Sequence, residues 1–462
     1  MCRSTAAIEK AGIPTVTVVG TTFVQVAKNA IVGMGFDELP MIVVPQDVLA
    51  GQIRDFKPAF AACRDDIVYG LTKWEAKTKV GIREPSPKKF TIEGANYQEA
   101  VDRMNALFLK NAWSDGMPLT PPTEERVKWL LTGTDLHRDE VIGTVGPRMG
   151  QSTVEAIAIN AAMAGARPEY MPVIIAAVKA MGSPEFALGE LQATTNPVAP
   201  FVIVNGPIAR EIGINSGCGL LGPAPAFPAG ATIGRALRLI LTTVGGAVSG
   251  ITDMAIHGQP GKYTGLVIAE AEDLSPWDPL HVERGYERNS NTVTALGVMG
   301  TTNYCCLADV AHIDKFLEGM AKFIAVPSLN YFLYLYVRAA EQGNAGVLLI
   351  PPHAARELAA RGWSKEKVKS FLFDKARISL YDFISYISFP FGREGALPVS
   401  LKDMPLETML PVARAPESFI VVVAGADLPY HWQWLPIGHG GQVSVTIDIQ
   451  LPANWNELLT KR

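Results

Sequence analysis

The chain has 462 residues, of which 48% are hydrophobic and 19% are charged. This composition is typical of a well-buried globular protein with about two to four domains, and it excludes an intrinsically disordered chain. The formal net charge is −4 and lysine and arginine never form a run longer than two residues, so we expect no nucleic-acid partner. The chain has no apolar run of eighteen residues and no leader pattern, which predicts a cytoplasmic protein that does not enter a membrane.

The five cysteines are odd in number, scattered and without a Cys-x-x-Cys spacing. This usage favours a reducing compartment and argues against a disulfide scaffold or a zinc knuckle. We expect three of them to be structural, because free buried cysteines commonly pack as small hydrophobic residues. These three are Cys63, Cys305 and Cys306.

The first segment of the chain predicts a small β-α-β unit. A short helix over 6–10 ends at Gly12-Ile13-Pro14, and a strand over 15–19, a helix over 22–34 and a strand over 41–44 follow. Cys2 stands where the first helix starts. The unpaired N–H groups and the dipole of a first helical turn lower the pKa of a thiol, so Cys2 is a candidate nucleophile.

Three stretches of this segment resemble the UGSC-like seleno/cysteine protein family and, more distantly, the selenocysteine-containing subunits of glycine and proline reductases. They are residues 2–16, 23–28 and 39–45, with the distinctive run Glu9-Lys10-Ala11-Gly12-Ile13-Pro14-Thr15. The resemblance covers about the first 75 residues. It implies a Cys or Sec that attacks a substrate or a partner protein. The Cys/Sec-x-x-Cys motif of the family lies mostly upstream of this start, so three alternatives stay open: the chemistry has moved, Cys2 acts alone, or the start codon trims a longer protein.

A charged, proline-containing stretch over 73–89 is the best candidate for a linker. We therefore expect three domains, over 1–90, 91–275 and 276–462. Beyond the linker the patterns predict helices over 96–111, 153–164, 168–181 and 232–243, a helix capped by Thr123, and a strand over 201–204.

The last part of the chain alternates strands with helices. Strands are predicted over 264–269, 293–298, 346–350 and 419–424, and helices over 312–324, 353–360 and 364–377. The alternation predicts an α/β fold with several mixed or parallel sheets, an N-terminal β-α-β element and a larger two-part α/β body. Ligands of such sheets bind beyond the carboxyl ends of the strands, so the loops there are candidate sites.

The glycine-rich loop between Asn205 and Pro223 is the first candidate site. Its backbone N–H groups and a following helix could bind an anionic substrate, and Cys218 in the loop is a second candidate nucleophile. The predicted substrate-binding residues here are Asn196, Asn205 and Asn215, with Arg148 in a separate turn. The alternative is a proline- and glycine-rich surface loop, and the spacing fits no known nucleotide-binding motif.

The second candidate site spans 257–286. His257 and His281 are candidate acid–base catalysts, and Lys262, Glu283 and Arg284 are candidate substrate-binding residues. An extended backbone would place His281 and Glu283 on one face. The alternative is a solvated histidine beside an Arg–Glu ion pair.

The third candidate site is the loop 427–441, which follows a buried strand. Asp427 is a candidate substrate-binding residue and His431 a candidate acid–base catalyst. Asp427, His431 and His439 could instead bind a divalent metal, which would be the only cofactor that the sequence indicates. A third interpretation is an aromatic loop packed against a neighbour.

We expect a cytoplasmic enzyme that acts on a small, anionic organic substrate by cysteine-dependent redox chemistry or cleavage of a carbon–heteroatom bond. The alternatives are a metal- or His/Asp-dependent hydrolase or lyase, and a non-catalytic subunit of a selenoprotein or cysteine redox complex. The apolar and aromatic content favours a homo-oligomer. The resemblance to the UGSC-like family implies a second partner, a small subunit encoded upstream. The enzyme hypothesis predicts that the loops 213–222, 257–286 and 427–441 converge on one cavity.

Overall fold

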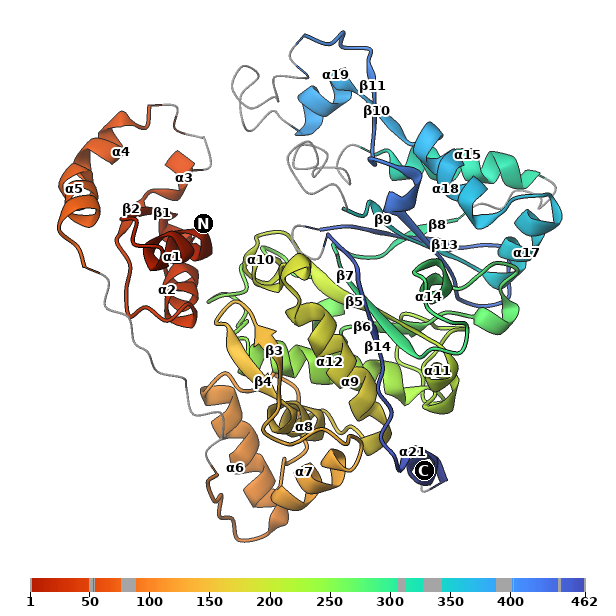
Figure 1. Cartoon of the computed structure of the whole chain (residues 1–462), viewed down its shortest axis with the longest axis horizontal. Coiled ribbons are helices and arrows are strands. Elements are labelled where there is room, and N and C mark those ends of the chain that lie inside the picture. The colour runs from red at the N-terminus through yellow and green to blue at the C-terminus, as the bar shows by residue number, and fades with distance from the viewer. Residues whose placement is uncertain are drawn as a thin grey trace.

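The computed structural model describes residues 2–49, 53, 55–75, 89–305, 312–326, 343–387, 401, 403–438 and 442–460. Strands and helices alternate along these residues and build several small sheets, as an α/β fold requires (Figure 1). The predicted fold class is therefore confirmed. Most of the predicted linker, residues 76–88, and the cysteine at 306 lie outside the described residues.

The N-terminal unit contains the predicted β-α-β element. Strand β1 (Thr17–Gly20) and strand β2 (Met41–Val44) pair in parallel, with helix α2 (Val24–Gly33) between them. Helix α1 (Cys2–Lys10) packs on α2, and the small core contains Ala6, Ile31, Phe36 and Leu39. The other helices of the unit are short: α3 (Gln46–Leu49), α4 (Lys57–Ala62) and α5 (Arg64–Thr72).

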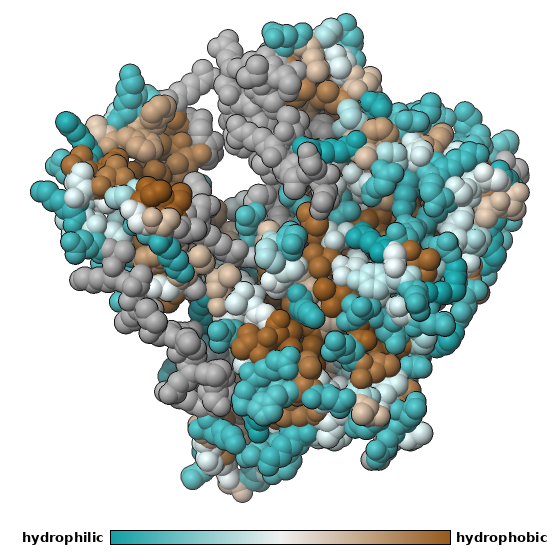
Figure 2. All heavy atoms as spheres, viewed as in Figure 1, coloured by the Kyte–Doolittle hydropathy of each residue, from teal (hydrophilic) through white to brown (hydrophobic). Residues whose placement is uncertain are grey.

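Apolar side chains are exposed on this unit, and Figure 2 shows them as brown patches over it. Phe56, Val68 and Tyr69 each keep half or more of their surface in contact with solvent. Contiguous exposed apolar surface is typical of interaction sites. The expected homo-oligomer stays a prediction.

The first sheet of the body has the strand order β14-β7-β5-β6. Strands β5 (Ala199–Asn205) and β6 (Leu266–Ala269) are parallel, and β7 (Thr292–Val298) is antiparallel to β5. Strand β14 (Val445–Asp448) pairs antiparallel with β7. All residues of β6 and β7 are buried, which explains their continuous apolar or small-residue sequences.

The second sheet has the order β12-β9-β13-β8 and the same strand directions. Strands β9 (Gly346–Ile350) and β12 (Phe419–Val423) are parallel, and β13 (Trp432–Pro436) is antiparallel to β9. Strand β8 (Thr302–Tyr304) pairs antiparallel with β13. Sequence analysis missed β13, because the aromatic and histidine residues around it were interpreted as one loop.

The two sheets pack directly against each other. Alternate strand residues of both sheets, including Phe201, Ile268, Leu349 and Val422, form one buried apolar cluster. The intervening strand residues face helices on the outer sides. Helices α8 (Val154–Met163), α9 (Met171–Gly182) and α12 (Pro228–Thr243) cover the first sheet, and α15 (Ile313–Ile324), α17 (Pro352–Ala360) and α18 (Lys365–Lys375) cover the second (Figure 1). The body is therefore a four-layer helix–sheet–sheet–helix sandwich.

The two halves of the sandwich repeat one topology. In each half, two parallel strands are joined through helices, and a third strand returns antiparallel beside the first of them. The strand that follows then crosses to the other sheet: β8 follows β7 but completes the second sheet, and β14 follows β13 but completes the first. This reciprocal exchange crosses the domain boundary predicted at residue 275 and ties the two halves together.

The remaining helices and strands connect or flank these layers. The helices are α6 (Tyr97–Lys110), α7 (Glu124–Leu131), α10 (Leu188–Ala193), α11 (Pro207–Glu211), α13 (Gly261–Thr264), α14 (Leu280–Glu283), α19 (Leu380–Asp382) and α21 (Trp455–Thr460). The strands form two antiparallel pairs, β3 (Val141–Val145) with β4 (Gly150–Thr153) and β10 (Arg377–Ser379) with β11 (Met409–Pro411). In the described ranges no single helix has the length and apolar character needed to cross a membrane. Two helices with a bend between them, over 168–182 and 184–193, reach that length and apolar character only when they are taken together.

The direct sheet-to-sheet contact predicts where the body is most sensitive to truncation. Leu435 is fully buried between the sheets, whereas Leu428 is 57% exposed on a loop of the same half. We expect Leu435→Ala to lower the free energy of unfolding by about 2–5 kcal/mol and Leu428→Ala to change it by less than about 0.5 kcal/mol. Urea denaturation followed by circular dichroism measures both, and equal losses would contradict a core between the sheets.

Candidate functional site

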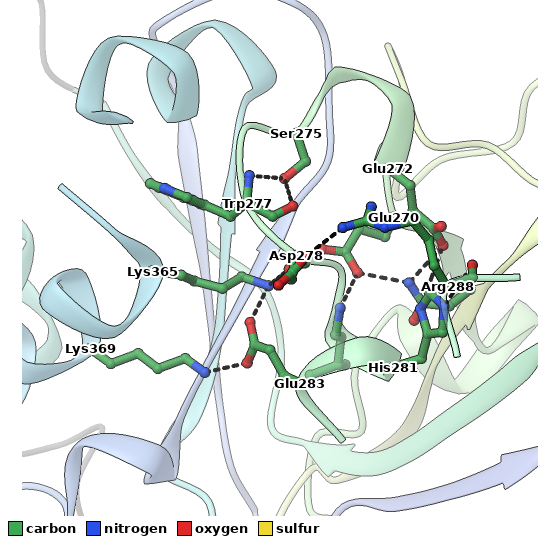
Figure 3. A network of polar contacts seen from close by, with 12 residues as sticks. Glu270, Glu272, Ser275, Trp277, Asp278, His281, Glu283, Arg288, Lys365 and Lys369 are labelled. Carbon is green, nitrogen blue, oxygen red and sulfur yellow. Dashed lines mark hydrogen bonds and ion pairs between the residues drawn. The ribbon is translucent and has the colours of Figure 1, made fainter. Parts of the chain in front are cut away.

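A buried polar network lies where β5 and β6 end (Figure 3). Asn205, the last residue of β5, is fully buried and donates from Nδ2 to Glu270 Oε2 at 2.8 Å and to Glu272 Oε1 at 2.9 Å. Glu272 Oε1 also accepts the backbone N–H of Gly206 at 2.7 Å. Because both strands are parallel, their carboxyl ends meet at one edge, as predicted for a ligand site in a sheet of this type.

The second half of the body supplies the cation of this network. Lys365 is 2% exposed, and its Nζ lies 2.5 Å from Glu283 Oε1, 3.7 Å from Glu270 Oε1 and 2.8 Å from the carbonyl oxygen of Asp278. Lys369, one helical turn further on, lies 2.5 Å from Glu283 Oε2 (Figure 3). A lysine in the first turn of a helix opposes the helix dipole. The attraction of the surrounding carboxylates of Glu270 and Glu283 offsets this unfavourable interaction with the helix dipole.

Three acceptor atoms in this network have no hydrogen-bond partner among the described residues. They are Oδ1 of Asn205, Oε1 of Glu270 and Nδ1 of His281. His281 is fully buried in α14, and its Nε2 lies 3.2 Å from the carbonyl oxygen of Arg288, so Nε2 is the donor of that contact. Its Nδ1 then faces Glu272 Oε1 at 3.9 Å. The network is therefore short of donors.

A cavity of about 340 Å³ opens beside Lys365. Its wall combines residues of both halves, since Trp277, Asp278 and Arg288 come from the first and Lys365 and Glu366 from the second. Arg288 forms an exposed ion pair with Asp278, and the Trp277 indole donates to the carbonyl oxygen of Trp363 at 3.0 Å. Sequence analysis did not find this cavity, because Lys365 and Glu366 lie nearly ninety positions after Asp278.

Comparison of the two halves of the sandwich distinguishes residues common to both from residues found in one half alone. In both halves an arginine follows the first strand and pairs with an aspartate after the second: Arg210 with Asp273, and Arg356 with Asp427. When these pairs and the strand registers are aligned, the polar residues of the network have apolar counterparts. Asn205, Glu270 and Glu272 correspond to Pro351, Ala424 and Ala426. The fold forms without these polar groups in its second half, so their presence in the first requires another reason.

The segment that contains His281 and Glu283 is not extended, so the condition for placing both side chains on one face is not met. Residues 280–283 form helix α14 after Pro279, so the two side chains point to different partners (Figure 3). His281 faces Glu272, and Glu283 binds the two lysines of α18.

A cysteine–histidine contact lies at the edge of the second sheet. Cys305 directly follows β8 and His431 directly precedes β13, and these strands are hydrogen-bonded neighbours. Cys305 Sγ lies 4.0 Å from His431 Nε2, and Asn303 Nδ2 lies 3.2 Å from His431 Nδ1. The Gln433 amide donates to Asn303 Oδ1 at 3.3 Å. Two neighbouring strands thus place three groups in contact: a thiol that can act as a nucleophile, an imidazole that can act as its base, and a carboxamide that orients the imidazole.

The backbone of His431 has φ of 61°, in the left-handed region that few residues other than glycine adopt. Such strain persists only where the surrounding structure holds it, and it often marks functional positions. Sequence analysis identified His431 as an acid–base candidate but interpreted Cys305 as structural. The pairing was not visible in the sequence, because 126 positions separate the two residues.

The loop 257–263 lies away from the polar network. It precedes β6, whereas Glu270 and His281 follow that strand, so the two groups are at opposite ends of the sheet. Lys262 Nζ binds Asp253 at 2.7 Å, and burial lowers the pKa of Lys262, opposed by the attraction of Asp253. His257 is exposed, and Asn196 precedes the amino end of β5. The structure therefore places Lys262, His257 and Asn196 away from the polar network at the carboxyl ends of β5 and β6.

Other predicted residues serve the local fold. The Asn215 side chain closes its own loop by donating to the carbonyl oxygen of Cys218 at 2.9 Å and accepting from the N–H of Gly217. Cys218 itself is exposed. Arg148 donates to the carbonyl oxygen of Thr243 at 2.7 Å. The use of this loop as an anion site stays a prediction.

The remaining candidate residues either bind other side chains or lie outside the described residues. Arg284 donates to Ser444 Oγ at 2.7 Å, and burial lowers its pKa. Both oxygens of Asp427 bind Arg356, at 2.7 and 2.9 Å. Within the described ranges no three His, Cys, Asp or Glu side chains form a metal-binding group. His439 and the side chain of Cys2 lie outside those ranges, so the metal site and the role of Cys2 stay predictions.

Comparisons with known proteins identify no relative: no protein-family description, curated protein or solved structure matches the chain. The resemblance of the N-terminal segment to the UGSC-like family therefore stays a prediction.

The buried lysine predicts a large effect of a single substitution. Lys365→Met leaves Glu270 and Glu283 without their shared cation, so we expect it to lower the free energy of unfolding by about 3–5 kcal/mol. Lys367→Met is the matched control two positions away. This exposed side chain donates to the Gly362 carbonyl oxygen and lies over the Trp363 ring, and we expect a loss of about 1 kcal/mol or less.

Chemical denaturation of the two variants measures this difference. The double variant Lys365→Met/Glu270→Gln should recover part of the lost stability, because it removes one of the uncompensated charges. Equal free energies of unfolding for the Lys365→Met and Lys367→Met variants would show that Glu270 and Glu283 do not need the charge of Lys365.

Proposed function

We propose that the protein is a cysteine-dependent enzyme in which Cys305 is the nucleophile, His431 the general base and Asn303 the residue that orients the imidazole. The contact of 4.0 Å between Cys305 Sγ and His431 Nε2 carries this proposal. It lies at the outer limit of a sulfur hydrogen bond, and catalytic contacts are often long in the free enzyme and tighten when substrate binds. The thiol is exposed, as a nucleophile must be.

The reaction class is cleavage of a carbon–heteroatom bond at a carbonyl carbon. When the Asn303 carboxamide is turned so that its oxygen accepts from Nδ1–H of His431, Nε2 is the acceptor nitrogen of the neutral imidazole. The Cys305 proton then passes to Nε2, and the sulfur attacks the carbonyl carbon of the substrate. The imidazolium then returns the proton to the departing nitrogen or oxygen, which leaves a thioester on Cys305. Water, deprotonated by His431, hydrolyses the thioester and restores the thiol.

Asn303 and Gln433 can support both states of the imidazole. A carboxamide presents either an N–H donor or a carbonyl acceptor when it rotates by half a turn. The Asn303 amide therefore matches Nδ1 with and without its proton, and its cross-strand neighbour Gln433 can rotate with it. The two strands hold this pair in register, so the base is oriented by the sheet itself.

Other features of the described residues favour this assignment over the alternatives. Cys218 is also exposed, but its Sγ makes no hydrogen bond to any residue that the structure describes. The His/Asp hydrolase alternative would use Asp427, whose two oxygens are already bound to Arg356. A partner subunit and a cytoplasmic location remain proposals that accompany the enzyme hypothesis.

The proposal predicts unequal reactivity of two exposed thiols in one molecule. We expect iodoacetamide at neutral pH to alkylate Cys305 at least about tenfold faster than Cys218, because the neighbouring imidazole of His431 can accept the thiol proton as the sulfur reacts. Peptide mapping by mass spectrometry at successive times measures both rates. Cys218 serves as the internal control for exposure.

The variant His431→Asn isolates the effect of the imidazole. Asparagine tolerates the left-handed backbone of this position, so the loop conformation is preserved. We expect the alkylation rate of Cys305 to fall to that of Cys218 in this variant. Equal rates of the two cysteines in the unaltered protein would overturn the proposal.

A further inference from the structure

A second, smaller cavity lies between the first sheet and the helices that cover it, at the amino ends of β5 and β6. Its volume is about 20 Å³, which exceeds the roughly 10–15 Å³ that one water-sized occupant needs. Apolar side chains of β5, β6 and α12 form most of the wall. The polar side chains in the wall are those of Gln192, Arg238 and Lys262. The cavity therefore has room for one small ion, and two cations face it.

The charged side chains beside this cavity carry one more positive than negative charge. Lys262 Nζ lies 2.7 and 2.8 Å from the two oxygens of Asp253, and Arg238 Nη1 lies 3.5 Å from Oδ2 of the same carboxylate. The side chains of both cations are 11% exposed and that of Asp253 is 2% exposed. Asp115, the other carboxylate that attracts Arg238, is already bound by Arg235 at 2.8 Å. Three largely buried cations therefore share two buried carboxylates.

The hydrogen bonds of the two cations leave donors over. An ammonium group has three N–H donors, and Asp253 accepts two of those of Lys262. The contacts of Arg238 with Asp253 and with Ser249 Oγ are both 3.5 Å long, at the limit of a hydrogen bond. Burial lowers the pKa of Arg238 and of Lys262, opposed by the attraction of Asp253. The single carboxylate therefore does not compensate both cations.

Gln192 adds an unpaired amide to the same wall. The residue is 1% exposed, and its Oε1 has no hydrogen-bond partner among the described residues. A carboxamide that rotates by half a turn presents its N–H₂ donor in place of its oxygen. The cavity can therefore offer an ammonium, a guanidinium and an amide donor to one occupant, which is the donor set that an anion requires.

We propose that a small monovalent anion of the size of chloride binds in this cavity between Lys262 and Arg238, with the Gln192 amide as a further donor. The anion would neutralise the excess charge of the cluster and accept the remaining N–H of Lys262. A water molecule has a suitable size but would leave the positive charge uncompensated, which is costly in a buried site. The ion would join α10, α12 and α13 at the end of the first sheet opposite the polar network. This site does not depend on the proposed chemistry of Cys305.

Thermal unfolding in two sodium salts tests the proposal. We expect the Tm of the full chain to rise by at least about 2 °C, and to reach a plateau, as chloride replaces gluconate at constant ionic strength, because an ion that binds only the folded state stabilises it. Gluconate is too large for the cavity. Lys262→Met removes the excess charge and should abolish this rise. Lys179→Met removes the same charge from an exposed position on α9 and should retain it.

Bromide locates the ion without any substitution. Anomalous scattering from crystals grown in sodium bromide should place a bromide ion within hydrogen-bonding distance of Lys262 Nζ. Equal Tm values in chloride and gluconate, or no bromide in this cavity, would overturn the proposal, and a neutral Lys262 amine would then account for the charge balance. A chloride-dependent rise that persists in Lys262→Met would also overturn it, because the anion would then bind elsewhere.

Discussion

The apolar contact between the two sheets is the interaction on which the rest of the structure depends. Each sheet is apolar on both faces, so it needs helices on one side and another apolar layer on the other. The second sheet provides that layer, and the exchange of β8 and β14 fixes the two sheets relative to each other. Every site described above lies at the ends or the edge of these strands. The geometry of the sites therefore follows from how the sheets pack.

The polar network shows how this packing brings distant residues together. Glu270 continues β6 in the first half, and Lys365 begins α18 in the second. Their charges compensate each other because the two halves meet there, so the ion pair requires the sheet contact, and loss of either partner would leave a buried charge unpaired. At the pseudo-equivalent end of the second half, Ala424 and Ala426 stand in place of the two glutamates. The comparison of the two halves thus shows that the strands form without these polar residues.

The cysteine–histidine pair depends on strand register rather than on burial. Asn303 and Gln433 are opposite one another in the β8–β13 ladder, and Cys305 and His431 extend the same ladder by one step at its end. A shift of one residue would turn these side chains to the opposite face. The buried Trp432 and Trp434 prevent that shift, because both fill the core under α15. Core packing therefore sets the distance between sulfur and imidazole.

The sequence by itself determined the α/β class, the β-α-β element and most helices and buried strands, because these follow from local hydrophobic periodicity and capping residues such as Thr123 and Ser364. It also indicated Asn205, His281 and His431 as unusual polar residues near strand ends. Only the tertiary structure decided that Lys365 completes the network and that Cys305 meets His431. Those contacts join residues that are far apart in the chain, and strand exchange between two sheets leaves no local pattern from which to predict them.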